Sequence, residues 1–161
     1  MAIPAAQLDI KSFSCIDNAC LRISDLTVII GPQASGKSVI CKLNYFFQNS
    51  LSSLPRTVQE SSDVADLGTR ILEEFDEWFR PSSWGSKAFS IKYSIGDHWI
   101  QISRGRSKSK SSRAKIVFSE AFEGTLARAY DMLANVRKKE PTEPKFIGFV
   151  WEHYEAVSKI V

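Results

Sequence analysis

The chain has 161 residues, a formal net charge of +3 and 43% hydrophobic residues, which is typical of one globular domain and excludes disorder throughout. The small net charge excludes nucleic-acid binding through overall charge, so any basic site must be local. Three cysteines without a CxxC pair predict neither a zinc site nor a disulfide framework. The sequence shows no signal-peptide pattern and no run of about 18 apolar residues, so we expect a cytoplasmic protein without a membrane contact.

The first fifty residues predict strands that lead into a helix. Alternating apolar residues at 8–10 and 21–23 predict a hairpin, with turn chemistry at 16–19. The run Leu26–Ile30 is apolar and β-branched, which is typical of a strand buried on both faces. Apolar residues then recur at helical spacing from about residue 37 to 50. A strand, a glycine-containing loop and a helix are therefore expected in direct succession.

A second hairpin is predicted at 88–103, where Gly96-Asp97 can form a two-residue turn with glycine first. Pairing across this turn sets Ile95 opposite His98, Tyr93 opposite Ile100, and Ile91 opposite Ile102. One face of the hairpin is then almost wholly apolar. Because His98 lies on that face, we interpret it as a core histidine rather than a catalytic one.

The remaining segments predict helices around this hairpin. Residues 51–87 predict a Ser-rich connector followed by a helix over 64–78. Residues 116–118 predict a short strand, and Ser119 is the expected N-cap of the helix that follows within 119–161. The last apolar stripe reaches Val161 without a glycine or proline to end it, so we expect the natural chain to continue.

One motif carries recognisable chemistry, Gly31-Pro32-Gln33-Ala34-Ser35-Gly36-Lys37-Ser38, which matches the pattern G-x-x-x-x-G-K-[ST]. The glycines let the backbone curl so that N–H groups point at phosphate oxygens, and the following helix presents its positive end to the same anion. Lys37 supplies a mobile charge for the β- and γ-phosphates, and Ser38 offers a hydroxyl ligand to Mg²⁺. We therefore predict that these eight residues bind ATP with Mg²⁺. A glycine turn that binds nothing is the alternative.

The residues around this motif resemble the N-terminal part of ABC-type ATPase heads of the SMC, RecF and OLD-like kind. The resemblance rests on Ile10-Lys11-Ser12-Phe13, on 21–32 and on the GKS end of the motif, while Gln33-Ala34 stands where that family commonly has Asn-Gly. It implies an α/β fold in which residues 1–161 form one P-loop NTPase lobe. Such a lobe has a Walker A strand, loop and helix at 8–50, an antiparallel β-subdomain at 88–118 and flanking helices.

The same resemblance implies partners and further contacts. It places adenine or ribose contacts at Ser12, Phe13 and Ser14. It also implies dimerisation with a second ATPase head around the nucleotide, in a DNA-related or phage-defence complex that includes DNA or a nuclease partner. These assignments come from the resemblance alone.

A complete head of that family also needs a signature sequence, a glutamine loop, a switch histidine and a Walker B strand ending in Asp-Glu. The nearest match to Walker B is 116–120, where Ser119 replaces the metal-binding aspartate, so Glu120 is a weak catalytic candidate and a helix cap is preferred. We expect ATP binding, with hydrolysis only after a further segment or partner completes the site. Two alternatives stay open, a small phosphotransferase of the nucleoside or shikimate kinase type and a non-hydrolysing scaffold.

The segment 104–115 is strongly basic and contains no acid. Its basic residues are Arg104, Arg106, Lys108, Lys110, Arg113 and Lys115. Such a segment can hold a nucleic-acid backbone by releasing counterions. Because it has no aromatic residue for base stacking, a solvated loop is the preferred interpretation and nucleic-acid binding the alternative.

Overall fold

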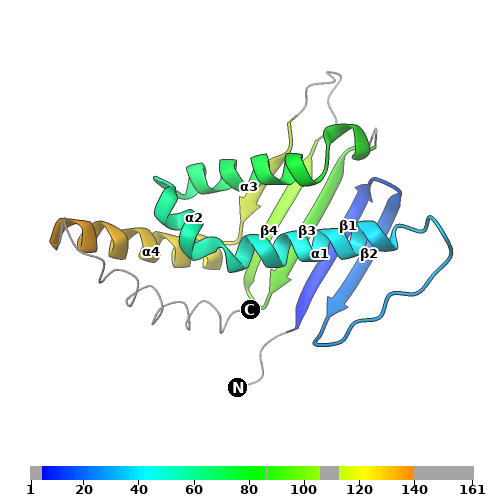
Figure 1. The fold of residues 1–161 in the computed structure, drawn as a ribbon, viewed down its shortest axis with the longest axis horizontal. Coiled ribbons are helices and arrows are strands. Elements are labelled where there is room, and N and C mark those ends of the chain that lie inside the picture. The colour runs from blue at the N-terminus through cyan, green and yellow to red at the C-terminus, as the bar shows by residue number, and fades with distance from the viewer. Residues whose placement is uncertain (1–4, 86, 106–112, 140–161) are drawn as a thin grey trace.

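The computed structural model describes residues 5–85, 87–105 and 113–139, and it shows a mixed α/β fold in two layers (Figure 1). One layer is an open antiparallel sheet of five strands in the order β2-β1-β3-β4-β5. The strands are β1 (Ala6–Phe13), β2 (Ile16–Ile23), β3 (Phe89–Ile95), β4 (His98–Arg104) and β5 (Lys115–Phe118). The second layer consists of α1 (Lys37–Ser52), α2 (Leu54–Glu60), α3 (Val64–Trp78) and α4 (Glu120–Lys139), with a short 3-10 turn, η1 (Pro81–Ser83).

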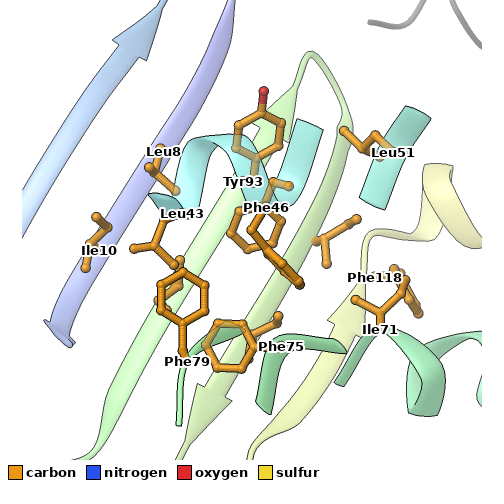
Figure 2. Close-up of a cluster of buried hydrophobic side chains, with 14 of the residues drawn as sticks. Leu8, Ile10, Leu43, Phe46, Leu51, Ile71, Phe75, Phe79, Tyr93 and Phe118 are labelled. Carbon is orange, nitrogen blue, oxygen red and sulfur yellow. The ribbon is translucent and has the colours of Figure 1, made fainter. Parts of the chain in front are cut away.

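The core lies between the sheet and the helices. α1 crosses the sheet over β1, β3 and β4 (Figure 1). Its buried apolar residues belong to the same core cluster as the buried residues of those strands. Figure 2 shows Leu8 of β1, Leu43 and Phe46 of α1 and Phe75 of α3 converging in this space. The rings of Phe46 and Phe75 are 5.5 Å apart, and both side chains are fully buried. Burying each such side chain stabilises the fold by about 1.5–3 kcal/mol.

The predicted β3–β4 hairpin is confirmed in its register. Ile95 pairs with His98, Tyr93 with Ile100, and Ile91 with Ile102. Gly96 begins the turn with a φ of 56°, a conformation that glycine adopts without steric cost. The Gly96-Asp97 turn and the apolar alternation both predict this register, so the local sequence is sufficient to predict the hairpin.

The predicted helices at 64–78 and after Ser119 are also confirmed. Asp63 caps α3, because its Oδ1 accepts a hydrogen bond from the Asp66 N–H at 2.9 Å. Ser119 caps α4 in the same way, accepting from the Phe122 N–H at 3.2 Å. α1 extends to Ser52, two residues beyond the predicted end, and the connector contains the short helix α2.

The predicted turn of the first hairpin is wrong. It lies at Ser14-Cys15 rather than at 16–19, with Phe13 paired to Ile16 across it. The Ser14 N–H donates to the Trp84 carbonyl at 3.0 Å, so a contact from a distant part of the chain fixes the turn. This contact and the apolar ladder outweigh the local turn preference of Asp-Asn.

The predicted buried strand at Leu26–Ile30 is also wrong. The segment has no regular secondary structure and belongs to no sheet, and Leu26, Val28 and Ile30 are 81%, 72% and 88% exposed. An apolar run forms a strand buried on both faces only where neighbouring strands pair with it and other elements cover it. The sheet of the described residues provides no such neighbour for this segment.

Several expectations fall outside the described residues. These are the positions Arg106, Lys108 and Lys110 and the predicted stripe that ends at Val161. Within the described ranges, no helix has both the length and the apolar composition that a membrane crossing requires.

Candidate phosphate-binding loop

The loop at 31–36 ends on a glycine that the structure requires for two reasons. Gly36 has a φ of 88° immediately before α1, in the left-handed region that favours glycine. A Cβ at this position would lie 2.7 Å from Cγ1 of Ile16 and 3.3 Å from Sγ of Cys15. The C-terminal end of the loop is therefore packed tightly against the β1–β2 turn.

Ala34 adopts the same unusual backbone region without being a glycine. Its φ is 62°, a conformation that costs an L-residue roughly 1–2 kcal/mol. This is the position where the resembling family commonly has glycine. The loop thus keeps a curled backbone even where the sequence does not favour it, and such backbone strain concentrates at functional sites.

The first turn of α1 faces the loop with its positive end uncompensated. No side chain caps this helix, and its first turn contains no acidic residue. The ladder of helical hydrogen bonds starts with the Ile40 N–H donating to the Gly36 carbonyl at 3.0 Å. The N–H groups before Ile40 and the helix dipole together favour an anion at this end.

The ammonium group of Lys37 folds back over the loop. Its Nζ donates to the Gly31 carbonyl at 2.9 Å, to the Pro32 carbonyl, and to Oγ of Ser35 at 3.3 Å. The positive charge is thereby held at the loop, on neutral acceptors that an anionic phosphate can replace. Charge-assisted hydrogen bonds to phosphate are stronger than those to neutral carbonyls.

Ser38 lies exposed in the first turn of α1, one residue beyond Lys37. Its hydroxyl is an oxygen ligand of the kind that Mg²⁺ accepts together with water and substrate phosphates. Among the described residues, no group of three or more His, Cys, Asp or Glu side chains is placed to hold a metal ion. Ser38 thus offers one oxygen donor of a kind that Mg²⁺ accepts.

The three residues expected near adenine or ribose have different environments. The Phe13 ring is 1% exposed and packs against Phe79 and Phe89 at centroid distances of 5.6 and 5.0 Å, so its side chain offers no surface to a base. Ser12 and Ser14 have φ values of 53° and 54° and flank it at the turn beside Gly36. The turn, rather than the Phe13 side chain, borders the loop.

Sequence reasoning missed Cys15 and Ile16, which make the close contact with Gly36. These residues are about twenty positions before Gly36, and no spacing or composition signals that they approach it. Cys15 is exposed, so its thiol is part of the accessible surface beside the loop.

The structure does not bring Glu120 to the loop. Glu120 is exposed at the start of α4, directly after β5, whereas the loop packs on the turn between β1 and β2. β5 and β1 are three strand spacings apart in the sheet, a lateral separation of roughly 14 Å. Ser119, which stands at the metal-binding position of a Walker B strand, instead caps α4.

Two other candidates have structural contacts. The Nε2 of His98 lies 3.3 Å from Oγ1 of Thr125, which supports its interpretation as a core residue. Arg104 donates from its guanidinium to the carbonyls of Gly85 and Lys87 at 2.7 and 2.9 Å. These hydrogen bonds tie Arg104 to the segment before β3. The side chains of Arg113 and Lys115 are exposed.

Comparisons with protein families, with curated proteins and with solved structures return no match for this chain. The site is therefore argued from the chain's own residues.

Proposed function

We propose that this chain binds Mg-ATP through the loop 31–38. The observation that carries the proposal is the position of Lys37, whose ammonium lies over a curled loop at the uncapped start of α1. A flexible cation, a positive helix end and a backbone held open by Gly36 all favour the same ligand, a chain of phosphates. The motif supplies the preference for a nucleoside triphosphate.

We further propose that the bound nucleotide is not turned over rapidly by this chain alone. Hydrolysis needs a group that orients the attacking water and charges that neutralise the transition state. The one acidic candidate, Glu120, follows β5 at one edge of the sheet, three strand spacings from β1, whose turn contacts the loop. A second ATPase head or a further segment would supply these groups, as the resemblance to SMC, RecF and OLD-like heads implies.

The exposure of the segment Leu26–Ile30 supports the proposal that a partner completes the site. The segment leads directly into the loop, and the side chains of Leu26, Val28 and Ile30 are exposed, while Ile29 packs partly against the core. A partner that pairs a strand with this segment and covers its faces would bury those side chains and fix the start of the loop. We therefore propose that the same partner that completes catalysis also pairs with this segment.

The binding proposal is tested by calorimetric titration of Mg-ATP into the wild-type chain and two variants. Lys37→Ala removes the phosphate-binding ammonium and should weaken binding by roughly ten- to a few-hundred-fold, since hydrogen bonds to charged groups contribute about 1.5–3 kcal/mol each. Lys87→Ala is the control, because Lys87 is an exposed lysine paired with Asp17. Wild-type affinity in Lys37→Ala would overturn the proposal.

The turnover proposal is tested by multiple-turnover hydrolysis with the purified chain. We expect slow or no phosphate release, whether or not Glu120 is present. Rapid hydrolysis that Glu120→Gln abolishes would contradict the proposal of an incomplete site. Rapid transfer to a small acceptor instead of water would favour a phosphotransferase.

A further inference from the structure

The face of the sheet opposite the helices is open in the described part of the chain. All four helices lie over the other face (Figure 1). Alternation along the strands gives the open face the side chains that do not enter the core. Its charged residues are Asp9 and Lys11 of β1, Arg22 of β2, Lys92 of β3 and Lys115 of β5. Four cations thus share this face with one acid.

The strand register distributes these cations over the whole face. Lys11 pairs with Ser90, which pairs with Ser103, which pairs with Lys115, so the two lysines lie in one row. Lys92 lies in the neighbouring row, directly opposite Asp9. Arg22 lies in the row after that, so cations occur at both edges and in the centre of the sheet.

None of these four cations forms an ion pair with a described residue. The single acid is occupied by other groups, since Oδ2 of Asp9 accepts from Nε2 of Gln7 at 2.9 Å. A hydrogen bond with Asp9 also raises the pKa of the Cys20 thiol, so Cys20 stays neutral and adds no negative charge. With four cations against one carboxylate, the described residues of this face carry more positive than negative charge.

An aromatic ring lies among these charges. Trp99 of β4 belongs to the row of Arg22, and the Nζ of Lys92 lies 4.6 Å from the centroid of its ring. Its side chain faces away from the core although indole rings are usually buried. A half-exposed indole beside a lysine combines the two contacts that single strands use, base stacking and phosphate neutralisation.

We propose that the open face of the sheet binds single-stranded nucleic acid, with Lys11, Lys92, Lys115 and Arg22 on the phosphates and Trp99 against a base. This surface is distinct from the phosphate-binding loop and adds a second function to the chain. An acidic protein segment would also be attracted by the charges, but a face with lysines and small polar residues around one ring is a poor protein interface, because lysine and serine are depleted there.

The test is fluorescence anisotropy with a labelled oligodeoxythymidine of about 20 nucleotides, at several salt concentrations between about 50 and 200 mM. Lys11→Ser/Lys92→Ser should weaken binding and flatten the plot of log affinity against log salt by about 0.7 for each lost phosphate contact. Trp99→Ala should weaken binding roughly five- to 150-fold with little change in the slope.

The matched control is Arg56→Ser/Arg128→Ser, which removes the same charge from the helical layer. Arg56 and Arg128 are exposed on α2 and α4, so this variant should keep the wild-type slope. Lys37→Ala should also keep it, which separates this proposal from the nucleotide site. Far-UV circular dichroism of each variant verifies the fold.

Three results would overturn the proposal. The first is no binding by the wild-type chain. The second is an unchanged slope in Lys11→Ser/Lys92→Ser while Lys108→Ser/Lys110→Ser flattens it, which would place the contact on the basic segment instead. The third is competition by poly-glutamate as effective as that by the oligonucleotide, which would make the face a site for acidic protein segments.

Discussion

β3 and the segment Leu26–Ile30 are both built largely from apolar and β-branched residues, yet they lie in opposite environments. Phe89, Ile91, Tyr93 and Ile95 of β3 are at most 6% exposed, whereas Ile30 is 88% exposed. β3 lies between β1 and β4, with α1 packed over it (Figure 1). The segment 26–30 has no such neighbours among the described residues. An apolar run therefore shows which side chains would stabilise the fold if they were buried. The strands and helices that lie next to the run in space determine whether they are buried.

The largest difference between the two regions should appear in their response to truncation. Ile91 of β3 is fully buried, so Ile91→Ala should reduce the free energy of unfolding by about 2–5 kcal/mol. Ile30→Ser should change it by less than about 0.5 kcal/mol, because its side chain is already in water. Urea unfolding measures both values. Comparable losses would show that the segment is buried in solution.

A second comparison uses two glycines in helices. Gly68 lies where α3 meets β5, and a Cβ there would be 3.0 Å from Cγ2 of Ile116. Gly68→Leu should therefore cost about 1–3 kcal/mol of stability through overpacking. Gly124 of α4 has open space around it, so Gly124→Leu should instead stabilise the chain by about 0.5–1 kcal/mol. Thermal or urea unfolding shows whether each variant lowers or raises the free energy of unfolding. A higher free energy of unfolding for Gly68→Leu would contradict the close packing of α3 on β5.

The smallest expected effect concerns the loop itself. Ala34→Gly removes the cost of a φ of 62° in a residue with a side chain. If the nucleotide binds to this same curled loop, the strain is common to the free and the bound states, so its relief should raise the free energy of unfolding by roughly 1 kcal/mol and leave the Mg-ATP affinity unchanged in calorimetric titration. Weaker binding in Ala34→Gly would show that the bound loop has a different backbone.

The parts of the fold that sequence predicted are those set by local chemistry. Gly96 and strict alternation determined the β3–β4 register, and Asp63 and Ser119 marked the starts of two helices. The first turn was misplaced because it depends on the contact between Ser14 and Trp84, which are 70 positions apart in the chain.

The same distinction applies to the candidate site. The loop motif could be recognised from the sequence because the spacing of its glycines, Lys37 and Ser38 is a local pattern; that these residues bind ATP stays a prediction. The packing of Cys15 and Ile16 on Gly36, the burial of Phe13 and the distance of Glu120 from the loop all depend on how the sheet is ordered. No local pattern encodes that order.

The central claim is that the loop 31–38 holds the phosphates of ATP, and nuclear magnetic resonance of the isotope-labelled chain tests it most directly. Mg-ATP should shift the backbone amide signals of Gly31 and of residues 33–38 in a saturable way, because the proposal places these N–H groups toward the phosphates; Pro32 has no N–H. AMP should shift them far less at the same concentration, since it lacks the β- and γ-phosphates that Lys37 contacts. The claim would be contradicted if Mg-ATP left the loop amides unchanged, or if the same shifts persisted in Lys37→Ala.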